Sequence, residues 1–243
     1  MELSNHALFM LALLALATGI NKTGFPGLGV LVVVLLTTVM PAKVSTGYLL
    51  PLLCFGDIVA ILYWRNNALW NVIIRLSPWV IAGIVIGFFL MKSIPDESYG
   101  IIFGSIVTAL FSLDIIRRYL HIDIPDDKSI IVGGFGLLAG LMTMMINAAG
   151  PVMIIYLLSM KISKQKFVAT CAWSYFIFNL VKIPFSYAQG LITPQSLLLN
   201  LKFAPLVVVG GVIGIIFMNK IPTKTFNIII WIFALLGGIK LFF

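Results

Sequence analysis

The chain has 243 residues, of which 61% are hydrophobic and 10% are charged, and its formal net charge is +8. Soluble domains carry roughly a quarter of charged residues, so the composition excludes a water-soluble protein and indicates an integral membrane protein. The basic residues lie singly between apolar stretches, where they orient membrane proteins, and they form no basic face for nucleic acid. The sequence therefore predicts one all-α polytopic membrane domain over residues 1–243.

The first apolar stretches, 8–16 and 30–36, are separated by a glycine-rich polar break. Each glycine in this break weakens a helix by about 1 kcal/mol, and Pro26 removes a backbone donor. At membrane depth such a backbone survives only where it is buried in protein or lines a polar cavity. We therefore predict a broken helix here, with a candidate site at the break.

The remaining apolar stretches follow one another with short joints. They are residues 44–64, 72–91, 98–116, a second broken segment at 130–160, 167–187, 197–218 and 226–243. Each broken segment counts once, so about eight apolar segments are expected. Only residues 117–129, with their run of acidic side chains, are predicted to form a solvent-exposed loop.

The two halves of the chain are related to each other. Residues 78–95 and 205–222 are identical at nine of eighteen positions without a gap. Upstream, Gly19 and Gly29 correspond to Gly140 and Gly150, so each half begins with a broken segment. We expect two repeats, at about 1–120 and 128–243, each with a broken or re-entrant segment and three transmembrane helices.

The repeats also contain matching GxxxG pairs. They are Gly83 with Gly87 in the first half and Gly210 with Gly214 in the second. Such pairs are typical of closely packed transmembrane helices, so we assign them a packing role and no ligand.

The distribution of Lys and Arg favours one orientation of the repeats. If each broken segment crosses the membrane once, the basic residues divide evenly between the two sides. If each broken segment instead enters the membrane and returns to the same side, ten basic residues lie on one side and four on the other. Known membrane topologies show a bias of this kind. We therefore expect inverted repeats with both termini outside.

Three ionisable residues lie inside the apolar segments, at a cost of about 3 kcal/mol each. They are Lys22, Asp57 and Lys182. Aligning Thr46 with Thr170 places Asp57 beside the position of Lys182 near the pseudo-two-fold axis. One interpretation is a structural ion pair between them. In the other, Asp57 couples transport to protons or cations and Lys182 binds an anion.

Lys22 lies beside a predicted half-helix end, where a cation and backbone N–H groups form an anion site. The alternative is that Lys22 extends to the membrane interface. Asn147 is the polar residue of the second break, and Asn179 shares a helix face with Lys182. The candidate substrate-binding residues are Lys22, Gly24, Gly27, Gly29, Asn147, Gly150, Lys182 and Asn179, with Asp57 as the coupling residue.

Two glycine-rich breaks, each followed by an apolar run, carry a family resemblance. They read Gly-Phe-Pro-Gly-Leu-Gly-Val-Leu-Val-Val-Val at 24–34 and Ile-Asn-Ala-Ala-Gly-Pro-Val-Met-Ile-Ile-Tyr at 146–156. A short joint and a helix that starts near Thr46 or Thr170 follow each break. Over its whole length the chain resembles the TauE/SafE family, also called the sulfite exporter or toluene-sulfonate uptake permease family.

The resemblance implies a multi-pass transporter in the cytoplasmic (inner) membrane of a prokaryote. Its substrates would be sulfur-containing anions such as sulfite, thiosulfate, sulfoacetate or other organosulfonates. The sequence contains no Walker motif, which favours a gradient-driven secondary transporter. An anion channel or a non-transporting membrane scaffold is the alternative.

An enzyme is not expected, because His6 and His121 are far apart and no Cys, His and carboxylate residues cluster. We expect no cofactor. The expected partners are a small anionic substrate and membrane lipid, without nucleic acid, and a homodimer stays open.

Overall fold

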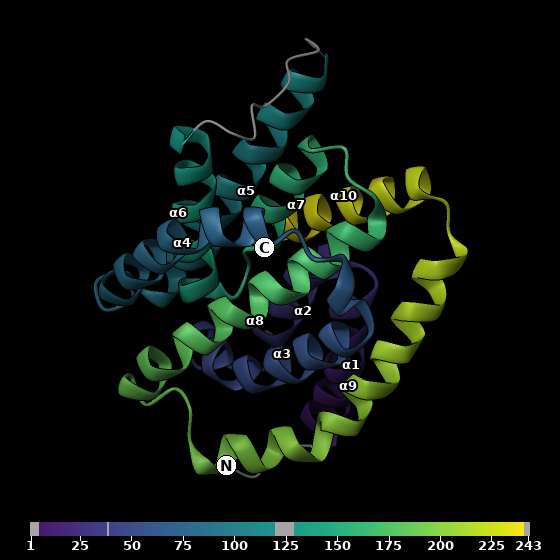
Figure 1. Cartoon of the computed structure of the whole chain (residues 1–243). Helices are drawn as coiled ribbons and strands as arrows, with labels where there is room; N and C mark the ends of the chain where they lie inside the picture. Colours follow the sequence, from purple (N-terminus) through teal and green to yellow (C-terminus); the bar gives the residue numbers. More distant parts are fainter. Residues whose placement is uncertain (1–4, 38, 120–128, 241–243) are drawn as a thin grey trace.

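In the computed structural model, which describes residues 5–37, 39–119 and 129–240, the chain forms helices joined by short connections and no strands (Figure 1). The first half contains α1 (Asn5–Thr23), η1 (Pro26–Leu28), α2 (Gly29–Thr37), α3 (Ala42–Trp64), η2 (Arg65–Asn67), α4 (Trp70–Leu90) and α5 (Asp96–Tyr119). The second contains α6 (Ser129–Ile146), α7 (Gly150–Ser159), α8 (Lys164–Ala188), α9 (Pro194–Lys220) and α10 (Thr223–Lys240). The predicted all-helical class is confirmed.

Five segments of the described chain are long and apolar enough to cross a membrane. They are Lys43–Asn67, Trp70–Leu90, Ser129–Ile146, Lys164–Ala188 and Pro194–Lys220. Shorter apolar helices are Leu8–Thr23, Pro26–Thr37, Gly150–Ser159 and Thr223–Gly237. These segments agree with a multi-pass membrane protein. Most of the predicted loop at 117–129 lies outside the described residues.

Both predicted breaks are present in the structure. The helix α1 ends at Thr23, and a short 3-10 turn that starts at Pro26 leads into α2 at Gly29. The helix α6 ends at Ile146, and α7 begins only at Gly150. Between them Asn147 has a φ of +54°, a left-handed conformation that asparagine tolerates better than most residues.

Side chains hold the broken ends in place. The last carbonyls of a helix lack partners inside it, and the indole N–H of Trp64 donates to the Thr23 carbonyl at 3.0 Å. The Thr23 hydroxyl also donates to the Gly211 carbonyl of α9 at 2.7 Å. In the second break, the Asn147 amide donates to the Thr46 carbonyl at 2.9 Å. Each break is therefore tied to helices far away in the sequence.

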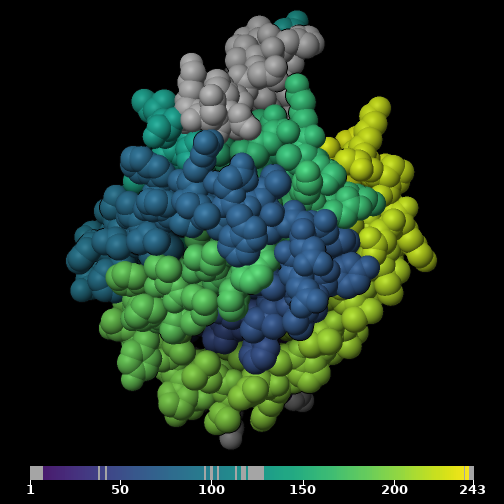
Figure 2. All heavy atoms as spheres, in the orientation of Figure 1, coloured from purple at the N-terminus to yellow at the C-terminus, as the bar shows by residue number. Residues whose placement is uncertain are grey.

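The short helices of the breaks lie inside the molecule. Seven consecutive residues of α7, Pro151 to Leu157, are buried. By contrast, α4 and α9 expose large apolar side chains such as Phe89 and Phe217, as lipid-facing helices do. In the space-filling view, α4, α8 and α9 cover much of the visible face (Figure 2).

Long-range packing joins the two halves. The helix α1 lies along α9, α4 lies along α6, and α3 crosses the centre beside α8 (Figure 1). In the first two pairs, the first helix of one half, α1 or α6, lies along the long helix that follows α8 or α3 in the other half. Their buried apolar side chains form two clusters, one that includes Val80 of α4 and Ala139 of α6, and one that includes Leu11 of α1 and Val207 of α9.

Glycines make the α1–α9 and α4–α6 contacts possible. A β-carbon on Gly19 would lie 2.6 Å from the Gly211 nitrogen, and one on Gly140 would lie 3.0 Å from the Gly83 Cα. On the opposite sides of these contacts, Gly83 and Gly210 meet partner backbone in the same way. The predicted close packing at the GxxxG pairs is confirmed.

We expect Gly19→Ala and Gly140→Ala to destabilise the protein by about 1–3 kcal/mol each, because overpacking pushes the paired helices apart. Gly134→Ala is the matched control, since a β-carbon there meets nothing within 4 Å. Thermal unfolding in detergent measures the effect. Equal melting temperatures for Gly140→Ala and Gly134→Ala would contradict this role for the glycines.

Candidate functional site

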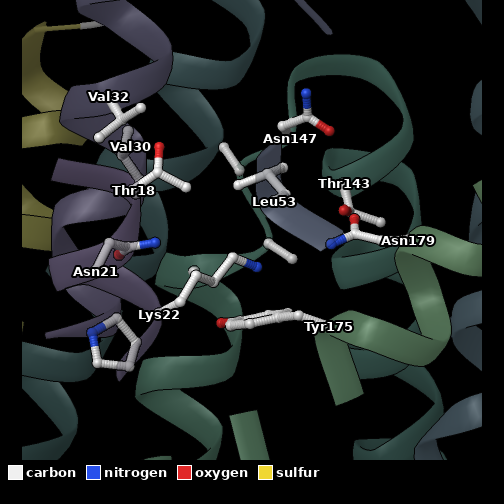
Figure 3. A pocket seen from close by; sticks show the side chains of 15 residues that line it. Thr18, Asn21, Lys22, Val30, Val32, Leu53, Thr143, Asn147, Tyr175 and Asn179 are labelled. Carbon is white, nitrogen blue, oxygen red and sulfur yellow. The ribbon is translucent and has the colours of Figure 1, made fainter. Parts of the chain in front are cut away.

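The two breaks meet at a cavity of about 30 Å³. A single water needs at least roughly 10–15 Å³ by this measure, so the space suits a few waters or a small ion. Asn21 and Lys22 at the end of α1, Asn147 in the second break and Asn179 of α8 line it (Figure 3). The cavity is therefore formed by both halves of the chain.

Two helices begin at the cavity wall. Gly29 is the first residue of α2 and Gly150 the first of α7, and both line the cavity. The first N–H groups of a helix lack intrahelical partners and carry a partial positive charge. The breaks thus bring two helix N-termini to one space, an arrangement that favours an anion.

Lys22 forms a buried ion pair with Asp57. Its Nζ lies 2.7 Å from Asp57 Oδ1, and the two side chains are 5% and 0% exposed. The Asn179 amide donates to Asp57 Oδ2 at 2.8 Å, and the Tyr175 ring lies 4.7 Å from the Lys22 Nζ as a cation–π partner. The alternative that Lys22 extends to the membrane interface is wrong, because its ammonium group is buried in protein.

Lys182 is also buried, but its partners are neutral. Its Nζ donates to the side-chain oxygens of Asn147, of Thr143 at 3.2 Å and of Asn179 at 3.4 Å. Among the described residues, no carboxylate forms an ion pair with it. The ion pair between Asp57 and Lys182 that one interpretation of the sequence expected is not formed, because Asp57 pairs with Lys22.

These contacts form one polar chain between the breaks. Lys22 of the first break contacts Asp57 on α3, which contacts Asn179 on α8. Asn179 accepts from Lys182, which in turn donates to Asn147 of the second break. A chain of side-chain contacts therefore connects the two breaks, and Lys22, Asp57, Asn179 and Lys182 in it are buried.

The described side chains of this network carry a formal net charge of +1. They contain two ammonium groups, Lys22 and Lys182, and one carboxylate, Asp57. This excess of positive over negative groups attracts an anion to the site.

The predicted glycine ligands divide into two groups. Gly29 and Gly150 line the cavity, whereas Gly24 and Gly27 do not. A β-carbon on Gly24 would lie 2.6 Å from the Gly214 carbonyl oxygen, and one on Gly27 would lie 3.0 Å from the Ile230 carbonyl carbon. These two glycines therefore allow α9 and α10 to approach the break.

The sequence interpretation missed several residues of the cavity wall, and the polar ones among them are Thr18, Asn21, Thr143 and Tyr175. Asn21 directly precedes Lys22, and Figure 3 shows its amide nitrogen directed toward the cavity. Tyr175, Asn179 and Lys182 are spaced four and three residues apart on α8, which places them on one helix face. That spacing is the signal that would have found Tyr175.

Other buried charges have local roles. Lys164 donates to the carbonyl oxygens of Met218 at 2.7 Å and Ile221 at 2.6 Å, and so caps the end of α9. Asp114 of α5 accepts a hydrogen bond from the Trp231 indole at 3.0 Å. Neither residue lines the cavity, which makes both useful as controls.

Comparison with known proteins identifies the family of the chain. The family model described as sulfite exporter TauE/SafE matches residues 11–241. Searches of curated proteins and of solved structures return no match. Because the family model covers nearly the whole chain, the protein belongs to the TauE/SafE family of membrane transporters for sulfite or related anions.

Proposed function

We propose that this protein is a secondary transporter that carries a small sulfur oxyanion or organosulfonate across the cytoplasmic membrane of a prokaryote. One observation carries the proposal most directly. The Lys22 ammonium lies at the wall of a cavity that two helix N-termini also reach. A cation beside oriented N–H groups in protein interior is suited to bind an oxyanion and to release it when the breaks move apart.

The size and walls of the cavity favour a small substrate. Besides its polar groups, the cavity is bounded by Val30, Val32 and Leu53. A cavity of about 30 Å³ suits the size of an inorganic oxyanion or a one-carbon sulfonate better than the size of an aromatic sulfonate. Sulfite, thiosulfate and methanesulfonate are therefore the first ligands to test.

Inverted repeats at about 1–120 and 128–243 within a single membrane domain are part of the proposal. Exchange of the halves converts the α1–α9 pair into the α6–α4 pair, and Gly19 and Gly140 occupy equivalent contacts in the two. Both breaks face one cavity, as in carriers whose site lies at the repeat interface. These features support a carrier over the alternatives of a channel or a scaffold, which need no matched breaks.

The experiment is a thermal-shift screen of the purified protein against sulfur oxyanions, sulfonates, acetate and chloride. A ligand at a hundred times its Kd adds about 2.7 kcal/mol to the free energy of unfolding. We expect stabilisation by a sulfur oxyanion or a small sulfonate that persists in Lys240→Gln, whose charge lies on the surface at the end of α10. If no anion in the panel stabilises the protein, the proposal is wrong.

The inverted arrangement predicts where the joints lie. Single cysteines at Ser129 and Ser163, in a background with Cys54→Ala and Cys171→Ala, should react with an impermeant maleimide only from the cytoplasmic side. A cysteine in place of Lys92 should react only from the outside. All three positions are exposed in the structure. Labelling of Ser129→Cys and Ser163→Cys only from the outside would rule out this orientation.

A further inference from the structure

We infer that the substrate anion and the Asp57 carboxylate compete for Lys22, so that the protein moves one proton in the same direction as each anion. The inference rests on the proposed function and adds the sign of its coupling. It predicts symport, in which Asp57 is protonated while Lys22 holds the anion. Exchange of an anion for a proton is the opposite arrangement.

The position of Lys22 between cavity and carboxylate is the basis of the inference. Lys22 lines the cavity, whereas Asp57 does not line it and is completely buried. The Lys22 Nζ is 2.7 Å from Asp57 Oδ1, and that oxygen accepts no hydrogen bond from another described residue. One ammonium group is thus shared between a fixed carboxylate behind it and the cavity in front of it.

An anion that enters the cavity draws the Lys22 ammonium away from Asp57. The carboxylate would then be buried with only the Asn179 amide as a close partner, and an isolated charge in such a place is strongly disfavoured. Uptake of a proton from water removes that charge. For a monoanion the network keeps a net charge of +1, because the added negative and positive charges cancel.

Asp57 is the carboxylate near Lys22 that can accept the proton. Its titratable neighbours are Lys22 of α1, Cys54 of α3, and Lys182, Tyr175 and Cys171 of α8. None of these is a second carboxylate. The sequences of α2 and α6 contain no titratable residue, α9 contains only Lys202 and Lys220, which are exposed, and Asp114, the buried carboxylate of α5, accepts from Trp231. The three oxygens around the Lys182 Nζ occupy its donors, so it is not free to replace Lys22 at Asp57.

Proton movement in proteoliposomes tests the inference directly. Methanesulfonate is the probe, because its acid is strong and no neutral form carries protons through the lipid. With an inward methanesulfonate gradient, a clamped membrane potential and a pH dye inside, the wild-type lumen should become acidic. Asp57→Asn should abolish the acidification, and Asp114→Asn should retain it, because Asp114 is a buried carboxylate away from the cavity.

Binding affinity gives a second, independent measurement. If one proton binds with each anion, the methanesulfonate Kd of the wild type falls up to tenfold for each unit decrease in pH while Asp57 titrates. Asp57→Asn should bind with a Kd that does not change with pH. The wild-type measurement remains decisive even if the variant fails to fold.

The outcomes are distinguishable. Binding that is independent of pH, or a lumen that stays neutral or becomes alkaline while methanesulfonate enters, overturns the inference and leaves the proposed function intact. Failure of the wild type to bind any sulfur anion at any pH overturns both.

Discussion

Lys22→Gln is expected to abolish anion binding and to destabilise the protein by about 3–5 kcal/mol. The destabilisation follows because Asp57 is left as a buried carboxylate without its ion partner, which is costly when one member of such a pair is removed. The loss of binding follows because the cavity loses the ammonium group at its wall. Thermal unfolding and isothermal titration with sulfite measure the two effects.

The double variant Lys22→Gln/Asp57→Asn separates these two roles of Lys22. Two neutral amides replace the ion pair, so most of the stability should return. Anion binding should not return, because no cation lines the cavity. Recovery of wild-type affinity in the double variant would show that Lys22 serves only as the structural partner of Asp57.

Lys182→Gln is expected to weaken anion binding at least tenfold although Lys182 does not line the cavity. Its ammonium group holds the side chains of Thr143, Asn147 and Asn179, and the last two also position the second break and Asp57. Leaving buried oxygens without a donor costs about 1–3 kcal/mol each, so the unfolding free energy should fall as well. Titration with sulfite and thermal unfolding again provide the measurements.

Lys164→Gln is the matched control for this prediction. It also removes a buried ammonium group from α8, but one that caps α9 with backbone oxygens away from the cavity. It should lower stability and leave the sulfite Kd unchanged. Because Lys182 makes no ion pair with Asp57, adding Asp57→Asn should not rescue Lys182→Gln. Equal Kd values for Lys182→Gln and Lys164→Gln would show that Lys182 has no positioning role.

Much of this arrangement could be predicted from the chemistry of individual residues. Several glycines close to a proline disfavour a continuous helix, so the first break could be located from sequence, whereas the single prolines Pro78 and Pro205 lie inside α4 and α9. Ionisable side chains are rare inside apolar segments, which marked Lys22 and Asp57 before any contact was known. Asn147 and Asn179 followed from their positions in the break and on the helix face of Lys182.

The partners of these residues could not be predicted in the same way. Periodicity fixes which residues share a face of one helix, but the depth at which α1 and α8 approach α3 depends on packing across the whole molecule. That packing brings Lys22 to Asp57 and directs Lys182 to Asn147. Similarly, a glycine that leaves room for a ligand looks the same in the sequence as a glycine that leaves room for a neighbouring helix. The packing role of Gly24 could therefore not be distinguished from the cavity-lining position of Gly29.

Uptake of radiolabelled sulfite into proteoliposomes tests most directly whether the protein carries an anion through the cavity between the breaks. The wild type and Lys240→Gln should accumulate sulfite faster than empty liposomes. Lys22→Gln/Asp57→Asn, once shown to be folded, should match the empty liposomes, because its cavity lacks the ammonium group. Equal uptake by the wild type and the folded double variant would contradict the proposed site, and uptake by neither would contradict anion transport.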